Sequence, residues 1–142
     1  MTTSLPPLPS DSSTHTELGS WGEEFAVQVL RRKGYVVLDR NWRTPHGEID
    51  IICRKSGTLV FVEVKTRRRR SSNYPLQETI THEKERRLYS LGELYQRRHQ
   101  LVMQRRRYAN VRFDLFVVAV HEAPFPYFYH YEGAFSFFPT VQ

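Results

Sequence analysis

The fold of this chain is organised around residues 47–67, which read GEIDIICRKSGTLVFVEVKTR. Two apolar, β-branched runs, residues 49–53 and 59–64, flank a Lys-Ser-Gly-Thr segment, and this pattern predicts a β-hairpin. Strands that are nearly continuously apolar are typical of a sheet covered on both faces. The stretch therefore predicts a central hairpin in a mixed sheet.

Three charged side chains interrupt the apolar runs, and they are Asp50, Glu63 and Lys65. If Ser56 and Gly57 form a two-residue turn, Asp50 lies directly opposite Glu63. Such partners have Cβ atoms about 4.5–5.5 Å apart, and two like charges there destabilise the hairpin. Lys65 follows Glu63 by two residues and so lies on the same face of the strand. Two carboxylates and an ammonium group are thus expected to converge.

This charged cluster has two interpretations. An exposed sheet face with a structural salt bridge is the ordinary explanation of a single Glu-x-Lys in a strand. The alternative is a divalent-metal site, because Mg²⁺ is usually held by one or two carboxylates together with waters and substrate phosphates. An ion would remove the repulsion between Asp50 and Glu63, and Lys65 would orient or deprotonate a water. The spacing alone leaves both interpretations open.

One helix and one strand are predicted before the hairpin. Thr14-x-x-Glu17 is a capping box, and apolar residues at helical spacing follow it. Glu23 lies at the rim of the apolar stripe whereas Glu24 points further into solvent, so Glu23 is the carboxylate expected to face the sheet. A surface glutamate near a helix N-terminus is the ordinary alternative. Residues 35–38 form the first predicted strand.

A second helix and two strands are predicted after the hairpin. The helix begins near residue 81 and places Lys84 on its packing side, where the stem either packs while the charge reaches solvent or the ammonium contacts a phosphate or the active site. Residues 111–120 and 127–131 read as strands, the last at an edge because prolines precede it. Asp114 is a rival carboxylate, but a structural pairing with Arg112 or another arginine is the favoured interpretation.

This order of helix, strand, hairpin, helix and two strands predicts an α/β fold, a mixed five-stranded sheet flanked by helices. Residues 1–13 are rich in Pro, Ser and Thr and predict a disordered tail, which leaves residues 14–142 as a single domain. No apolar run reaches the ~18 residues of a membrane span, and no signal peptide is apparent. With a single cysteine, these features predict a cytoplasmic protein without an internal disulfide.

The net charge of +6 predicts a polyanionic partner, and DNA or another nucleic acid is the one expected. Residues predicted to contact phosphates are Arg43, Arg67, Arg68, Arg69, Arg70 and Lys84. A solvated charge tract is the usual interpretation of four consecutive arginines, but this run begins two residues after Lys65. The histidine spacings do not suit a zinc hydrolase, and no P-loop motif is present.

Further motifs are spread along the chain. They are Gly22-Glu23 with Ala26, Gly34-Tyr35, Asn41 with Arg43, Gly47-Glu48-Ile49-Asp50, residues 59–67 (LVFVEVKTR), Lys84, Arg112-Phe113-Asp114 and Gly133-Ala134-Phe135. In this combination the chain resembles the YraN family of small bacterial predicted endonucleases, over roughly residues 20–137. That family is regarded as distantly related to archaeal Holliday-junction resolvases and to the PD-(D/E)xK nuclease superfamily. Ile49 stands where the superfamily has a proline.

The resemblance implies a restriction-endonuclease-like domain and a metal-dependent endonuclease acting on DNA, including branched or flapped DNA, and it implies a homodimer. Asp50, Glu63 and the backbone carbonyl of Val64 would hold Mg²⁺ or Mn²⁺, with Lys65 positioning the attacking water. Glu23 would anchor the ion through a water or support a second ion. The competing hypothesis is a nucleic-acid-binding module that keeps the fold but lacks turnover, and metal dependence separates the two.

Overall fold

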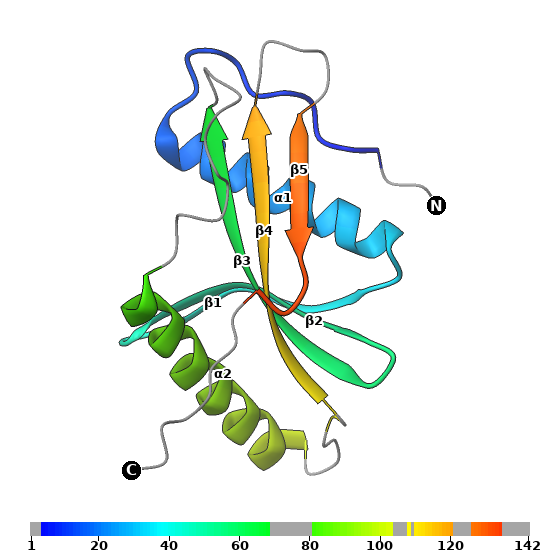
Figure 1. The fold of residues 1–142 in the computed structure, drawn as a ribbon, viewed down its shortest axis with the longest axis vertical. Helices are drawn as coiled ribbons and strands as arrows, with labels where there is room; N and C mark the ends of the chain where they lie inside the picture. Colours follow the sequence, from blue (N-terminus) through cyan, green and yellow to red (C-terminus); the bar gives the residue numbers. More distant parts are fainter. Residues whose placement is uncertain (1–3, 69–80, 104–107, 109, 121–125, 135–142) are drawn as a thin grey trace.

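The protein is described here by a computed structural model that covers residues 4–68, 81–103, 108, 110–120 and 126–134 (Figure 1). In these residues the elements are α1 (His15–Arg32), β1 (Val36–Thr44), β2 (Gly47–Lys55), β3 (Thr58–Arg68), α2 (His82–Met103), β4 (Asn110–Val120) and β5 (Tyr127–Tyr131). The strands form one mixed five-stranded sheet. The predicted α/β class and its flanked sheet are confirmed.

The strand order in the sheet is β1-β2-β3-β4-β5. Strands β3 and β4 are parallel, and every other neighbouring pair is antiparallel. A parallel pair needs a crossover connection, and α2 lies within this one. The predicted two-residue turn is also confirmed, because Lys55 pairs with Thr58 and the register continues to Ile51 with Val62. Ser56 and Gly57 both have positive φ, as a twist-matched hairpin turn requires.

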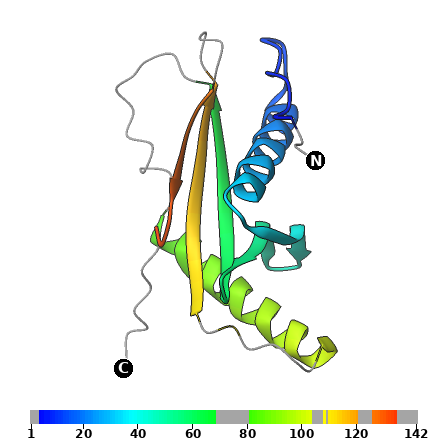
Figure 2. The same ribbon diagram turned by 90° about the vertical axis from the view of Figure 1, so that its right-hand side faces the viewer.

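Two hydrophobic cores lie on opposite faces of the sheet. Successive side chains of β3 alternate between them, the even-numbered ones facing α1 and the odd-numbered ones facing α2. The core under α1 includes Phe25, Ala26, Leu30, Val60, Val62, Val64, Phe116 and Val118. The core under α2 includes Leu59, Phe61, Leu88, Leu91, Tyr95, Phe113, Leu115 and Val117. In Figure 2, α1 flanks the upper part of the long strands and α2 lies at their lower end.

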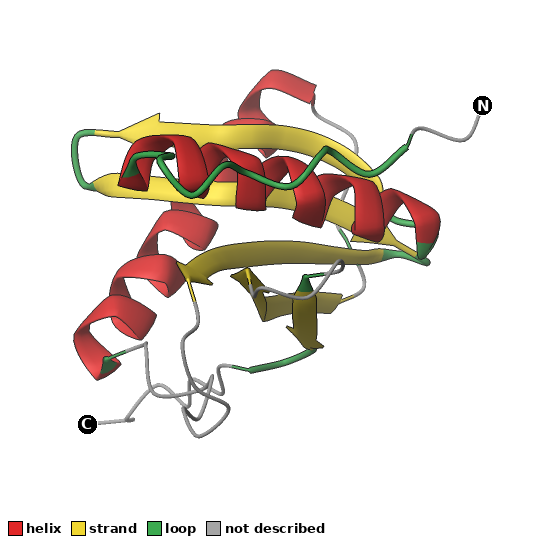
Figure 3. Ribbon diagram, turned by 90° about the horizontal axis from the view of Figure 1, so that it is seen from above, coloured by secondary structure: helices red, strands yellow, loops and turns green. Residues whose placement is uncertain are grey.

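Strand β1 is longer than the predicted residues 35–38, since it continues through a polar segment to Thr44. At the edge of the sheet, polar side chains point to solvent while the backbone pairs with β2. The pattern of apolar residues therefore does not predict this part of the strand. The ladder is interrupted between Val37 and Asp39, and Asn41 has a positive φ of 49°. Seen from above, α1 runs alongside β1 and β2 (Figure 3).

The N-terminal segment contacts α1 and β3 through a few polar groups. The capping box is present, since Thr14 N donates to Glu17 and Glu17 N donates to Thr14 Oγ1. Before it, Trp21 Nε1 donates to the Pro7 carbonyl at 2.6 Å, and Arg68 donates to the Ser10 carbonyl at 2.6 Å. Disorder of residues 1–13 stays a prediction.

Of the described helices, neither is both long and apolar enough to span a membrane.

Helix α1 approaches β3 most closely at Gly22, where an added Cβ would overlap the Thr66 side chain. We therefore expect Gly22→Ala to lower the free energy of unfolding by about 1–3 kcal/mol through overpacking. Gly19, in the same helix, has open space around a new Cβ, and Gly19→Ala is the matched control. Urea denaturation should show it stabilised by about 0.5–1 kcal/mol. Equal stability of the two variants would refute the close-approach argument.

Candidate functional site

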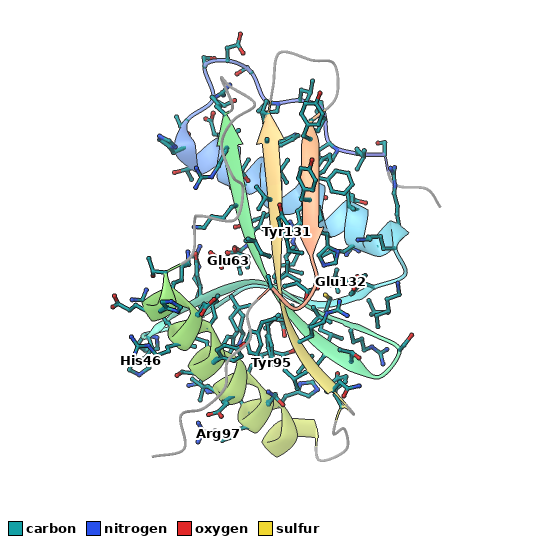
Figure 4. The ribbon with its side chains drawn as sticks, in the orientation of Figure 1. His46, Glu63, Tyr95, Arg97, Tyr131 and Glu132 are labelled. Carbon is teal, nitrogen blue, oxygen red and sulfur yellow. The ribbon has the colours of Figure 1, made fainter. Side chains whose placement is uncertain are left out.

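The predicted charged cluster forms where β2, β3 and the first turn of α2 meet. Asp50 is 7% exposed and Glu63 is 6% exposed, so both carboxylates are buried. Lys84 Nζ lies 2.7 Å from Glu63 Oε1, and Lys65 Nζ lies 3.6 Å from the same oxygen. Figure 4 shows Glu63 beside β3, above the start of α2. The structure thus brings together two acids and two lysines from three elements.

Asp50 stands one position beyond the last paired residues of the β2–β3 ladder. Its Oδ2 accepts a hydrogen bond from the backbone N–H of Val64 at 2.8 Å. The carboxylate thus takes the role that a backbone carbonyl of β2 would have if the strand pairing continued. Burial, and then the negative charge of the neighbouring Glu63, raise the pKa of Asp50 to about 8. The carboxyl group therefore holds a proton at neutral pH in the absence of another cation.

The two lysines differ in their electrostatic environment. Burial and the adjacent Lys84 lower the pKa of Lys65, against the attraction of Glu63. Burial acts on Lys84 as well, but its contact with Glu63 outweighs that effect and raises the pKa of Lys84. Lys65 is consequently the lysine that loses its proton more readily. Lys84 keeps its charge as the direct counterion of Glu63.

Glu23 approaches this cluster from α1 without joining its direct contacts. Burial raises the pKa of Glu23, the negative charges of Glu48 and Glu63 add to the rise, and a hydrogen bond from Asn41 opposes it. Among the described residues, no group of three or more His, Cys, Asp or Glu side chains is close enough to hold one ion. Glu24 points elsewhere, because it pairs with Arg40 at 2.8 Å. Both glutamates are half-buried, and the pKa of Glu23 responds to the charge of Glu63. The role of Glu23 in the site stays a prediction.

Asn41 was noted in the sequence only as part of a motif with Arg43, and no role in the site was predicted for it. It lies between Arg40 and Trp42, which pair with Ile51 and Ile49, so Asn41 stands across the ladder from Asp50. Its left-handed backbone, φ 49°, is one that asparagine adopts more readily than most residues. The available signal was an asparagine after two charged residues near a strand end, and that signal alone also describes a loop.

The predicted phosphate-contacting residues that the structure describes differ in exposure and in their contacts. Arg43 is 76% exposed at its side chain and pairs with Glu48 at 3.1 Å. Arg67 is half-buried on β3, and Arg68 contacts the N-terminal segment. The predictions for Arg69 and Arg70 lie outside the described residues. Lys84 belongs to the carboxylate cluster itself.

Asp114, the rival carboxylate, lies in a separate network on the α1 side of the sheet. It is fully buried and accepts bonds from Arg112 Nε at 2.8 Å and Gly133 N at 2.9 Å. His130 Nε2 lies 2.7 Å from its other oxygen. Burial tends to raise the pKa of Asp114, but these hydrogen bonds outweigh burial and hold it below the ordinary value. The predicted structural pairing with Arg112 is confirmed.

The chain matches known proteins over most of its length. A family model described as "Uncharacterised protein family UPF0102" matches residues 22–118. A UPF0102 protein of Dictyoglomus turgidum is 42% identical over 99 residues, which cover 70% of this chain and 79% of that protein. One of Syntrophomonas wolfei is 42% identical over 106 residues, covering 75% and 87%. One of Rhodococcus opacus is 37% identical over 118 residues, covering 83% and 95%.

Proposed function

We propose that this protein, which belongs to the uncharacterised protein family UPF0102, is a divalent-metal-dependent endonuclease that hydrolyses phosphodiester bonds in DNA. The observation that carries the proposal is the buried pair of Asp50 and Glu63 with Lys65 beside it. Two adjacent buried carboxylates are unfavourable unless a proton or a cation neutralises them. The family descriptions carry no activity, so the reaction is inferred from the site.

The donor set suits Mg²⁺ or Mn²⁺. Both ions prefer oxygen ligands, and Mg²⁺ is commonly held by one or two carboxylates while waters and substrate phosphates fill the other positions. Asp50 and Glu63 supply two such carboxylates, and the carbonyl of Val64 is the backbone oxygen assigned to the same ion. Glu23, which feels the charge of Glu63 from α1, would act through a water. The residues therefore fit the ion that the sequence predicted.

When bound, the ion would polarise the scissile phosphate and lower the pKa of its water. Lys65 lies beside Glu63, and its lowered pKa favours the neutral amine, which would accept a proton from the attacking water. As an ammonium group it would instead offset negative charge that builds up on the phosphate. Lys84 keeps its proton through Glu63 and would be able to bind a phosphate oxygen once Glu63 serves as a ligand of the ion.

The net charge of +6 supports DNA as the substrate, since lysines and arginines that neutralise phosphates supply most non-specific affinity. A branched or flapped substrate and a homodimeric enzyme follow only from the resemblance to the YraN family. Both remain proposals.

A second candidate function is a DNA-binding module without turnover. One observation favours it: Lys84 and Lys65 already neutralise Glu63, and a proton neutralises Asp50 at neutral pH. A site satisfied in this way is stable without an ion. The two functions differ in metal binding. Only the enzyme requires a metal ion to displace the two lysines from Glu63 and the proton from Asp50.

Calorimetric titration of Mn²⁺ is the experiment that tests the proposal. We expect Glu63→Ala to weaken Mn²⁺ binding by about 100-fold or more relative to the wild type, because half of the carboxylate set is lost. Glu24→Ala is the matched control, since Glu24 pairs with Arg40 outside the cluster, and it should bind Mn²⁺ like the wild type. Equal binding by wild type and Glu63→Ala would refute the proposed ligand set.

The same titration has an expected pH dependence. Asp50 has a pKa raised to about 8, so below that pH the ion must displace its proton. Affinity should therefore fall by up to about tenfold for each pH unit below 8, with proton release visible as a buffer-dependent heat. Without metal, the free energy of unfolding depends on pH in the opposite direction to the metal affinity. The raised pKa of Asp50 stabilises the fold at low pH, and this contribution is lost as the pH rises through 8.

A further inference from the structure

A row of tyrosines on β5 lies across the sheet from the proposed catalytic row on β3. The register pairs Glu63 with Leu115 and Leu115 with Tyr131, and Lys65 with Val117 and Val117 with Tyr129. In the same way, Arg67 pairs with Ala119 and Ala119 with Tyr127. Residues in one such row point to the same face of a sheet. The three tyrosines and the three charged residues therefore share a face.

The two rows are close enough for one nucleotide to span them. Neighbouring strands lie about 4.8 Å apart, so β3 and β5 are separated by about 10 Å across β4. In Figure 4, Glu63 and Tyr131 lie at a similar level of the sheet. A phosphate on the β3 side and its base on the β5 side would fit this separation.

Two of the three tyrosines are about half exposed, unlike the core aromatics. Tyr127 is 53% exposed and Tyr129 is 50% exposed. The rings of Tyr129 and Tyr131 are nearly parallel, with an interplanar angle of 20° and centroids 6.0 Å apart. By contrast, Phe128 on the opposite face packs on Phe116 and Phe25 and serves the α1 core. Tyr131 also packs against the core under α2, so Tyr127 and Tyr129 are the tyrosines of β5 that core packing leaves exposed.

We propose that Tyr127, Tyr129 and Tyr131 form a stacking platform for unpaired bases of a DNA strand whose phosphates lie along Lys65, Arg67 and Lys84. Proteins that hold single strands combine a row of positive charge with aromatic rings on which successive bases stack. Base faces are covered in a duplex and become available only where bases are unpaired or extruded. The inference rests on the proposed nuclease function for its reaction, and it makes the substrate class DNA with a single-stranded segment.

Binding without metal tests the platform separately from catalysis. The probes are an oligothymidylate of about 20 nucleotides, an abasic strand of the same length and a duplex, each followed by fluorescence anisotropy. The variant Tyr127→Leu/Tyr129→Leu removes two rings, and Tyr127→Phe/Tyr129→Phe keeps them. Val111→Ala, another exposed apolar position, is the distant control.

The leucine variant should bind oligothymidylate at least about tenfold more weakly, because stacking on one aromatic ring contributes about 5- to 150-fold per base. Its affinity for the abasic strand and for the duplex should change less than about twofold, and the phenylalanine variant should bind all probes like the wild type. Unchanged oligothymidylate binding, or an equal loss on all three probes, would overturn the platform. An equal loss accompanied by conversion of a dimer into monomers would assign this face to a second copy of the chain.

A measurement on the unmodified protein covers the case in which the leucine variant fails to fold. Photocrosslinking with oligothymidylate that carries 4-thiothymidine should label the peptide containing Tyr127–Tyr131, and labelling confined to other peptides would overturn the platform.

The results also distinguish failure of the platform from failure of the proposed nuclease function. An inactive protein that still discriminates thymidylate from abasic strand supports the platform and removes the nuclease, whereas cleavage without discrimination removes the platform alone.

Discussion

Replacing Asp50 or Glu63 with alanine is expected to lower Mn²⁺-dependent nicking of supercoiled DNA by on the order of a thousandfold, because removal of one preorganised electrostatic group in an active site typically costs about 10²–10³ in rate. The two carboxylates are buried side by side, so neither can substitute for the other as a ligand. The measurement is the initial rate of conversion of supercoiled to nicked plasmid at saturating Mn²⁺.

Affinity for DNA is the control that separates loss of chemistry from loss of substrate. Without metal at neutral pH, Glu63→Ala removes a negative charge, whereas Asp50→Ala removes a carboxyl group that is already protonated. Metal-free DNA binding by both variants should therefore stay within about threefold of the wild type or become tighter. Glu24→Ala should nick like the wild type. A wild-type protein that cleaves no DNA with Mg²⁺ or Mn²⁺, yet binds it in a salt-dependent manner, would leave the binding module as the function.

Replacing Asp114 with alanine is expected to destabilise the fold by about 3–5 kcal/mol, since removal of one partner of a buried ion pair leaves the other uncompensated. Arg112 and His130 both depend on this carboxylate, and so does the backbone N–H of Gly133. Urea denaturation at neutral pH measures the effect. Glu132→Gln is the matched control, because Glu132 is exposed, meets Arg112 at 3.9 Å and accepts a bond from Tyr35 that glutamine can also accept. This variant should unfold like the wild type.

Acidification should remove the contribution of Asp114 to the free energy of unfolding. Its folded pKa is held below the ordinary value of aspartate, so it contributes stability above that value, and this contribution is lost as the pH falls through the lowered folded pKa. Asp114→Asn should therefore lose less stability than the wild type as the pH falls below about 4. An identical acid transition in the two proteins would contradict the assigned pKa.

Local rules predicted the hairpin and its charges well. The period of two along a strand is fixed by backbone geometry, so Glu63 and Lys65 had to share a face wherever β3 lay. The Ser-Gly turn fixed the register as far as Ile51 and Val62, and Asp50, one residue beyond this ladder, lies beside Glu63. These conclusions needed only residues near one another in the chain.

The remaining parts of the site depend on how distant elements meet. Lys84 was predicted to face the core, but its contact with Glu63 depends on where the crossover places α2. Asn41 depends on a positive φ in an edge strand, which no apolar pattern encodes. The tyrosine row became meaningful only when the β3–β4 and β4–β5 registers placed it opposite Lys65.

The alternation along β3 also limits how this protein can change during evolution. Val62 and Val64 pack beneath α1, and Glu63 between them faces the opposite side of the sheet. Insertion or deletion of a single codon within this strand would exchange the two sets, placing valines in the charged cluster and burying a glutamate and a lysine under α1. Relatives should therefore differ in length at the turns that flank β3 and keep the spacing within the strand constant.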